Sequence, residues 1–164
     1  MKIGIIGPSK LKEKQKILKI AKIIAKSGNE VVLTPDKGST SEYFAKEYIK
    51  NNGKKIYSVL PLDDKERGYS WVNTDLGEKV NCGTWRNQLE KLDEETDALV
   101  SIGQAVWGII EICYTKWFKP KPVYIITDID SEKLPSVMEK ELDIHYISIS
   151  ELDKKLKWTS NNKN

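Results

Sequence analysis

Short runs of apolar residues alternate along the chain with segments in which apolar positions recur every three or four residues. Runs of the first kind are typical of strands that are buried on both faces, and segments of the second kind are typical of helices. Their regular alternation predicts parallel strands joined by helical crossovers. We expect strands at residues 2–6, 30–34, 55–60, 98–102, 123–127 and 145–149.

The segments between these strands predict the helices. Ser39 and Glu42 have the spacing of a capping box, which marks a helix start. In the helix that follows the fourth strand, an apolar stripe predicts the packed face, and Glu111 lies off that stripe beside Trp107 and Tyr114. That stripe consists of Val106, Ile109, Ile110, Cys113 and Trp117. The other helices are expected at residues 10–26, 39–52, 84–92, 131–141 and 150–158.

This order of elements predicts an α/β fold, a Rossmann-like three-layer αβα sandwich with a mostly parallel sheet. The chain has 164 residues, which suits one domain. We expect a single Rossmann-like nucleotide-binding domain at residues 1–158 and a disordered tail at residues 159–164. A long connection at residues 61–83, rich in Asp, Gly and Asn, is expected to be functional or disordered.

Composition excludes several classes of protein. The longest apolar runs have about six residues, whereas a membrane-spanning helix needs ~20, so we expect no membrane partner and a cytoplasmic location. The two cysteines, Cys82 and Cys113, lack CxxC spacing and the chain has one His. Neither a metal site nor a disulfide framework is indicated, and no cofactor is expected.

Charge is distributed unevenly. Residues 1–60 carry 13 basic and 5 acidic side chains, whereas residues 61–118 carry 6 and 11. Much of the basic excess is lysine in the helix expected at residues 10–26. A basic helix can attract nucleic acid, but a solvated helix face explains the same lysines, and no arginine cluster accompanies them. A nucleic-acid partner is therefore disfavoured.

Three predicted turns follow strands that should be neighbours in the sheet. They lie at residues 7–9, 35–40 and 103–107, and each precedes a helix. Helix N-termini attract anions because their N–H groups are free and the helix dipole is positive there. We therefore expect a small nucleotide or other phosphorylated ligand at this edge of the sheet. The ligand-binding candidates from the first two turns are Gly7, Pro8, Ser9, Gly38, Ser39 and Thr40.

About residues 1–127 resemble a known superfamily. The Arg86–Asn87 pair and the segment GQAVWGIIE, which is similar to Gly-Gly-x-x-Gly-Thr-x-x-Glu, match motifs of the SLOG superfamily. This superfamily of Rossmann-like proteins includes LOG-type phosphoribohydrolases and molybdenum cofactor carrier proteins. A weaker likeness is to nucleoside 2-deoxyribosyltransferases. Gln104 and Trp107 stand at two of the motif's glycines, and Gly108 stands at its threonine.

The resemblance implies a hydrolase that cleaves the N-glycosidic bond of nucleoside 5′-monophosphates. Glu111 would stabilise the oxocarbenium-like transition state, and Arg86 would bind the phosphate or position the glutamate. The alternative is a non-catalytic carrier or sensor of a nucleotide or molybdopterin-type ligand, which the substituted glycines favour. The resemblance also implies a homodimer or a larger homo-oligomer. Further ligand-binding candidates are Asn87, Gly103, Gln104, Trp107 and Gly108.

Each candidate also has an ordinary structural explanation. Glutamate on a surface helix is usually solvated, and Arg86 has the spacing to pair with Glu90 on a helix surface. Gly38, Ser39 and Thr40 form a common turn and cap. The Trp107 indole could fill the space that glycine leaves open or stack on a base.

Overall fold

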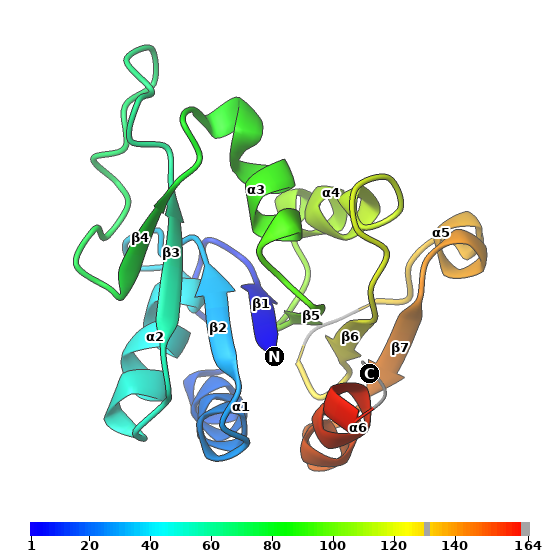
Figure 1. The fold of residues 1–164 in the computed structure, drawn as a ribbon. Helices are drawn as coiled ribbons and strands as arrows, with labels where there is room; N and C mark the ends of the chain where they lie inside the picture. Colours follow the sequence, from blue (N-terminus) through cyan, green and yellow to red (C-terminus); the bar gives the residue numbers. More distant parts are fainter. Residues whose placement is uncertain (130–131, 162–164) are drawn as a thin grey trace.

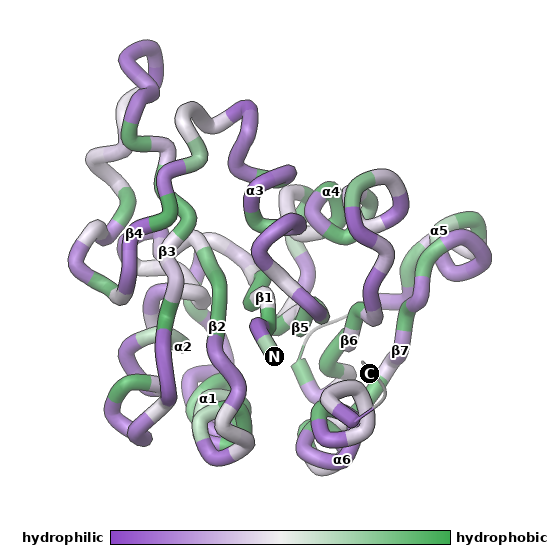
Figure 2. Tube along the Cα trace, in the orientation of Figure 1, coloured by the Kyte–Doolittle hydropathy of each residue, from purple (hydrophilic) through white to green (hydrophobic). Residues whose placement is uncertain are grey.

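The computed structural model describes residues 1–129 and 132–161. Its strands form one seven-stranded sheet in the order β4-β3-β2-β1-β5-β6-β7 (Figure 1). All neighbouring strands are parallel, so the predicted fold class is confirmed. The central strands are hydrophobic along most of their length (Figure 2). The strands are β1 (Lys2–Ile6), β2 (Glu30–Leu33), β3 (Ile56–Leu60), β4 (Glu78–Asn81), β5 (Ala98–Ser101), β6 (Val123–Ile126) and β7 (Ile144–Ile147).

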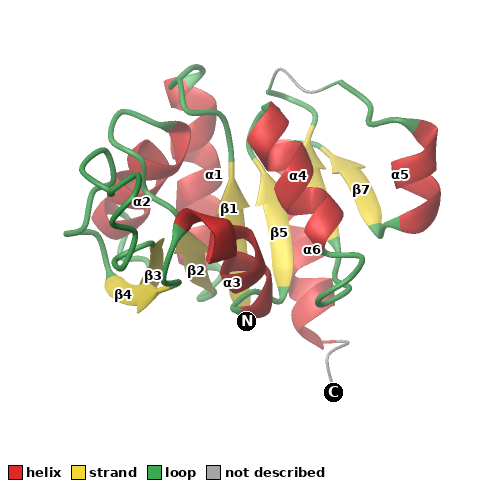
Figure 3. Cartoon of the chain, turned by 90° about the horizontal axis from the view of Figure 1, so that it is seen from above, coloured by secondary structure: helices red, strands yellow, loops and turns green. Residues whose placement is uncertain are grey.

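Helices cover both faces of the sheet. In Figure 3, α3 and α4 lie in front of the strands, and α1, α2 and α6 lie behind them. Each layer encloses its own apolar core. Among the described residues, no helix combines the length and the apolar character needed to cross a membrane. The helices are α1 (Lys14–Lys26), α2 (Thr40–Lys50), α3 (Gln88–Glu94), α4 (Val106–Tyr114), α5 (Ser136–Glu141) and α6 (Ile149–Asn161).

Two helices differ at their ends from the prediction. α1 begins four residues later, because Glu13 has a left-handed backbone with φ 52° and the preceding residues form a loop. α6 continues to Asn161, so residues 159–161, which were expected to belong to a disordered tail, are helical. Thr159 is buried and its hydroxyl bonds to the hydroxyl of Tyr124, which anchors this last turn to β6. Residues 162–164 lie outside the described residues, as does residue 131, where another helix was expected to begin.

The long connection at residues 61–83 is ordered and contains a strand that the apolar pattern missed. β4 has mostly exposed side chains and pairs with β3 at the edge of the sheet. Gly77 precedes it with φ 74°, and a Cβ there would lie 2.5 Å from the Ile56 carbonyl oxygen. Glycine therefore allows the connection to approach β3 closely enough for pairing.

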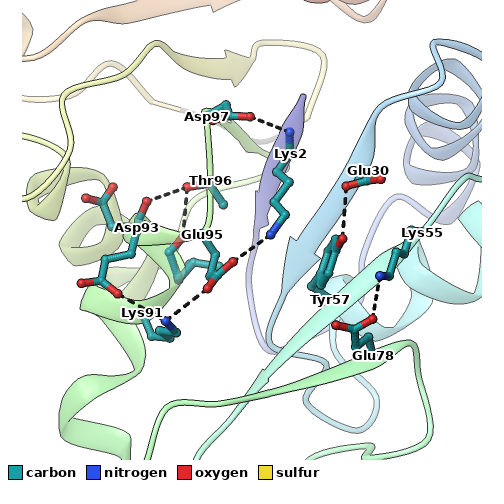
Figure 4. A network of polar contacts seen from close by, with 12 residues as sticks. Lys2, Glu30, Lys55, Tyr57, Glu78, Lys91, Asp93, Glu95, Thr96 and Asp97 are labelled. Atoms are coloured by element: carbon teal, nitrogen blue, oxygen red, sulfur yellow. Dashed lines mark hydrogen bonds and ion pairs between the residues drawn. The ribbon is translucent and has the colours of Figure 1, made fainter.

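A network of charged and polar side chains occupies the amino ends of the strands (Figure 4). Lys2 Nζ lies 2.8 Å from Glu95 Oε2 and 4.0 Å from the centroid of the Tyr57 ring. Tyr57 in turn donates to Glu30 Oε2 at 3.3 Å. Because the strands are parallel, these contacts lie at the edge opposite to the predicted ligand crevice, and we assign them a structural role.

Candidate functional site

The carboxyl ends of β1, β2 and β5 meet at one edge of the sheet, and the three predicted turns converge there. Two cavities occupy this place. The lysine cavity has a volume of about 230 Å³, and its lining includes Ser9, Lys10, Lys12, Thr40, Gly103 and Gln104. The carboxylate cavity has a volume of about 50 Å³, and its lining includes Gly7, Ser9, Asp36, Gln88, Trp107 and Glu111. Ser9 lines both, so the two cavities are neighbours.

Close approach of the loops shapes the lysine cavity. A Cβ on Gly7 would lie 3.0 Å from the Ile102 carbonyl oxygen, and Gly103 has φ 86°. Both positions therefore favour glycine. Thr40 opens α2 and donates its backbone N–H to the Pro8 carbonyl at 3.2 Å. Its hydroxyl oxygen is buried and has no hydrogen-bond partner among the described residues, so an unused polar atom lies in the wall of this cavity.

Two carboxyl groups line the carboxylate cavity. Glu111 is 8% exposed, and burial raises its pKa to about 8, with a smaller upward contribution from Asp36. Gln88 opposes this shift, because its Nε2 donates to Glu111 Oε1 at 3.4 Å. Burial also raises the pKa of Asp36 to about 6. At neutral pH, Glu111 therefore carries a proton and can donate a hydrogen bond, while Asp36 is chiefly charged.

The position of Glu111 reverses the prediction for α4. The helix buries Gly108, Glu111 and Ile112, whereas Val106 is 77% exposed and Trp117 78%. The stripe expected to pack against the sheet therefore faces largely outward, and Glu111, which was expected off that stripe, faces inward.

Tryptophans border the carboxylate cavity. Trp107 Nε1 donates to Gln88 Oε1 at 3.4 Å. Trp85 lines the same cavity and stacks on Trp71 with ring centroids 5.3 Å apart. Trp71 belongs to the long connection at residues 61–83. The backbone carbonyl of Trp71 accepts a hydrogen bond from the Lys37 N–H at 2.8 Å. The long connection thus forms a fixed wall beside the crevice.

Arg86 and Asn87 are not brought to Glu111. The Arg86 side chain is 79% exposed and lies 3.5 Å from Glu66 Oε2. Asn87 is exposed, and its Oδ1 accepts from the Thr84 hydroxyl at 2.9 Å. Neither residue lines the two cavities. Their assigned roles stay predictions, and the expected pairing of Arg86 with Glu90 is replaced by the contact with Glu66.

The remaining predicted residues fall into two groups. Pro8, Ser9, Thr40, Gly103 and Gln104 line the lysine cavity. Gly7, Ser9, Ser39 and Trp107 line the carboxylate cavity. Gly38 does not line either one: its N–H donates to Glu42 Oε2 at 2.9 Å, while Ser39 Oγ accepts from the Glu42 N–H at 3.1 Å. The predicted cap is therefore present, and Gly38 belongs to it.

Three residues that contribute to the site were not singled out from the sequence. Gln88 directly follows the Arg86–Asn87 pair and contacts Glu111 in their place. Asp36 lies three residues after the end of β2, and a carboxylate close to a strand end was the available signal. Lys10 lies in the loop that was predicted as helix.

The two cavities differ in the polar groups that line them. Lys10, Lys12 and the N-terminus of α2 border one cavity together with a single acidic residue, Glu13, and suit an anion such as phosphate. Carboxyl groups and an amide border the other and suit a group that donates hydrogen bonds. No group of three or more metal-ligating side chains occurs in the described part of the chain.

Several solved structures share the fold of this chain. No family model matches the sequence, and no curated protein matches it. Among solved structures, the molybdenum cofactor carrier protein of Chlamydomonas reinhardtii has a TM-score of 0.73 at 18% identity, over 98% of this chain and 99% of that chain. The molybdenum cofactor binding protein of Rippkaea orientalis has a TM-score of 0.72 at 14% identity, over 96% and 95%.

A third structure broadens the likeness. DNA processing protein A of Helicobacter pylori, described with a single-stranded DNA binding mode, has a TM-score of 0.62 at 13% identity, over 96% of this chain and 80% of that chain. At these identities the likeness concerns the fold. The resemblance to Rossmann-like proteins that include molybdenum cofactor carriers is confirmed at that level.

Proposed function

We propose that this protein is a non-catalytic carrier or sensor of a small phosphorylated ligand of the nucleotide or molybdopterin type. The observation that carries the proposal is the pair of neighbouring cavities at the carboxyl ends of β1, β2 and β5. The phosphate of the ligand would bind in the lysine cavity, near Lys10, Lys12 and the start of α2. A hydroxyl or amino group of the ligand would reach the carboxylate cavity.

Three features support binding rather than turnover. Arg86 pairs with Glu66 and does not line the cavity that Glu111 lines. The Trp107 indole borders the cavity at a position where the resembling motif has glycine. The fold is shared with proteins whose structures are described as binding or carrying the molybdenum cofactor. The carboxylate cavity, at about 50 Å³, admits a small group and not a whole ring.

The test is a thermal-shift and calorimetric titration with AMP, GMP and molybdenum cofactor released from a molybdoenzyme. A ligand at 100 times its Kd should stabilise the protein by about 2.7 kcal/mol. The double variant Lys10→Ala, Lys12→Ala should weaken binding at least tenfold, because each charge-assisted contact contributes about 1.5–3 kcal/mol. Lys14→Ala, an exposed lysine outside both cavities, is the matched control. The absence of a shift with all three probes would refute the proposal.

A second candidate is the phosphoribohydrolase, and the ionisation of Glu111 favours it. A carboxyl with a pKa of about 8 in a cavity matches the requirement for acid–base chemistry near neutral pH. In this case Glu111 would deliver or take a proton at the N-glycosidic bond, and Asp36 would stabilise positive charge on the sugar.

Release of free base from AMP and GMP, measured by chromatography, separates the two candidates. The carrier predicts binding without base release by the wild-type protein. The hydrolase predicts base release that Glu111→Gln abolishes and that Glu94→Gln, at an exposed position on α3, leaves intact. Equal release by all three proteins would assign the activity to a contaminant and would reject the hydrolase.

A further inference from the structure

Side chains of α1 and α6 line a groove on the face of the sheet opposite to α4. Figure 3 shows both helices behind the strands, whereas α3 and α4 lie in front of them. The groove has a volume of about 850 Å³. Two half-buried isoleucines, Ile23 and Ile149, belong to its lining and pack against the apolar core. We call it the α1–α6 groove. Its lysines are Lys16, Lys19, Lys22, Lys26 and Lys157.

The positive charge of α1 is not balanced by acidic residues of the same helix. All five charged residues of α1 are lysines. Lys19, Lys22 and Lys26 form no ion pair in the described part of the chain. Like charges three or four positions apart repel each other on a helix. The lysines of α2 differ, because Lys46 and Lys50 pair with glutamates of their own helix at 2.8 and 2.7 Å.

The acidic residues of the groove are engaged in other contacts. Asp153 lies 2.6 Å from Lys157 Nζ, and Asp128 Oδ2 accepts the first backbone N–H of α6 at 2.6 Å. Lys16 lies 3.3 Å from Glu13 Oε2 and donates to the Asp128 carbonyl. The lining contains five lysines and two aspartates, so its net charge is +3. Solvation explains lysines on the outside of a single helix, whereas here lysines of two helices line one groove.

The three unpaired lysines form one stripe. They occupy positions i, i+3 and i+7 of α1, so the stripe is about 10 Å long at about 1.5 Å per residue. Glutamates at the same spacing on another helix form a stripe of equal length. A helix of about 14 residues, embedded to half of its cross-section, displaces about 800 Å³, which matches the groove. α1 and α6 have 13 residues each and can flank such a helix along its length.

The remaining residues of the lining distinguish between two kinds of polyanion. Proteins that bind single-stranded nucleic acid stack the bases on aromatic side chains, and the lining contains neither an aromatic residue nor an arginine. Ile23 and Ile149 offer aliphatic surface, which suits the apolar face of an amphipathic helix. We propose that the α1–α6 groove binds an acidic amphipathic helix of a partner protein. Its carboxylates would lie against Lys19, Lys22 and Lys26, and its apolar side chains against the two isoleucines.

The α1–α6 groove adjoins the lysine cavity. Lys16 and Asp128 line the groove, and the residues that follow them, Ile17 and Ile129, line the lysine cavity. A partner in the groove therefore lies beside the cavity proposed for the phosphate of the ligand. The docking itself requires no ligand, so it can be tested independently of the proposed function.

Fluorescence anisotropy of a labelled synthetic peptide, titrated with the full chain, tests the proposal. The peptide is an amphipathic helix of about 14 residues, with glutamates at i, i+3 and i+7 and leucines on the adjoining stripe. A scrambled peptide of the same composition should bind at least about tenfold more weakly, because its carboxylates form no stripe. Binding of the amphipathic peptide should also weaken as salt is added.

Reversal of the charges in the stripe should weaken binding of the amphipathic peptide at least about 30-fold, because three attractions become repulsions. The variant is Lys19→Glu, Lys22→Glu, Lys26→Glu. Glutamine at the same three positions, a milder change for the helix, should give a smaller loss. The matched control has the same net charge as the glutamate variant, reverses exposed lysines outside the groove and should retain binding within about threefold. It is Lys65→Glu, Lys79→Glu, Lys140→Glu.

Three results would overturn the proposal. The wild-type protein could fail to bind the amphipathic peptide, or bind the scrambled peptide equally well. The control variant could weaken binding as much as the stripe variant does. Oligothymidylate could bind the wild-type protein more tightly than the peptide and lose that binding in the stripe variant, which would assign the groove to nucleic acid.

Discussion

Replacement of Glu111 by glutamine should stabilise the protein, and the gain should depend strongly on pH. Burial raises the pKa of Glu111 from 4.5 to about 8 in the folded chain. Between these two values the folded state holds a proton that the unfolded state releases. Folding stability therefore falls as the pH rises from about 4.5 to about 8, and it is constant outside this window. Glutamine has the same shape and no proton to lose.

The magnitude follows from the pKa. Each pH step inside the window costs about 1.4 kcal/mol of stability. The cost to the wild-type protein is thus about 3 kcal/mol at pH 7 and about 5 kcal/mol above pH 8, and Glu111→Gln should remove it. For a chain of this length, 1 kcal/mol corresponds to roughly 2–4 °C in Tm. At pH 8 the variant should therefore melt about 10–20 °C above the wild type.

Urea unfolding of both proteins at several pH values between 4.5 and 9 measures this effect. The two stabilities should converge at the acidic end and separate as the pH rises. Glu94→Gln, at an exposed position of α3, is the control and should stay within about 0.5 kcal/mol of the wild type at every pH. If the difference in unfolding free energy between Glu111→Gln and the wild type stayed constant over the whole pH range, burial would not raise the pKa of Glu111 as argued.

Two further substitutions test the packing behind the site. Gly4→Ala should cost about 1–3 kcal/mol, because its Cβ would lie 2.4 Å from Leu99 Cδ2; unchanged urea unfolding would contradict this close approach. Asp93→Asn should cost about 3–5 kcal/mol, since it removes the carboxylate that lies 2.6 Å from the buried Lys121 ammonium and leaves that charge only neutral acceptors. The double variant Asp93→Leu, Lys121→Met should regain most of that loss in the same assay, and an equal loss in both would contradict the reasoning.

The place of the two cavities could be predicted from the sequence, because small residues mark the turns that border them. Gly7 and Gly103 each follow an apolar run, and each permits loops to approach more closely than a side chain would allow. Hydrophobic periodicity then supplied the order of strands and helices. These local signals suffice because each one depends on residues close together in the sequence.

Which face of α4 is buried could not be predicted from such local patterns. Periodicity shows that Val106, Ile110 and Trp117 share a stripe, but a stripe that meets the core and a stripe that meets another surface have the same spacing. Glu111 contacts Gln88, 23 positions away in the chain, and its pKa is raised by Asp36, 75 positions away. Such contacts have no local signature.

The position of Arg86 has a similar cause. The resemblance placed it beside Glu111, but Trp85 is held by the long connection, with its backbone N–H 3.0 Å from Asp64 Oδ2. This contact turns the short helix that begins at Trp85, and Arg86 then points toward Glu66. β4 was missed because its side chains are mostly exposed, so that its pairing leaves no apolar alternation.

The strand order has a consequence for how the protein acquires its binding site. β1 lies between β2 and β5, which are about 70 residues apart in the chain. The first 60 residues can pair β1 with β2 and β2 with β3, yet they lack the glycine turn and the carboxyl that follow β5. During synthesis, the crevice therefore does not exist until most of the chain has been made. A ligand that binds there therefore stabilises only chains in which this part of the sheet is complete. It does not stabilise nascent or truncated chains.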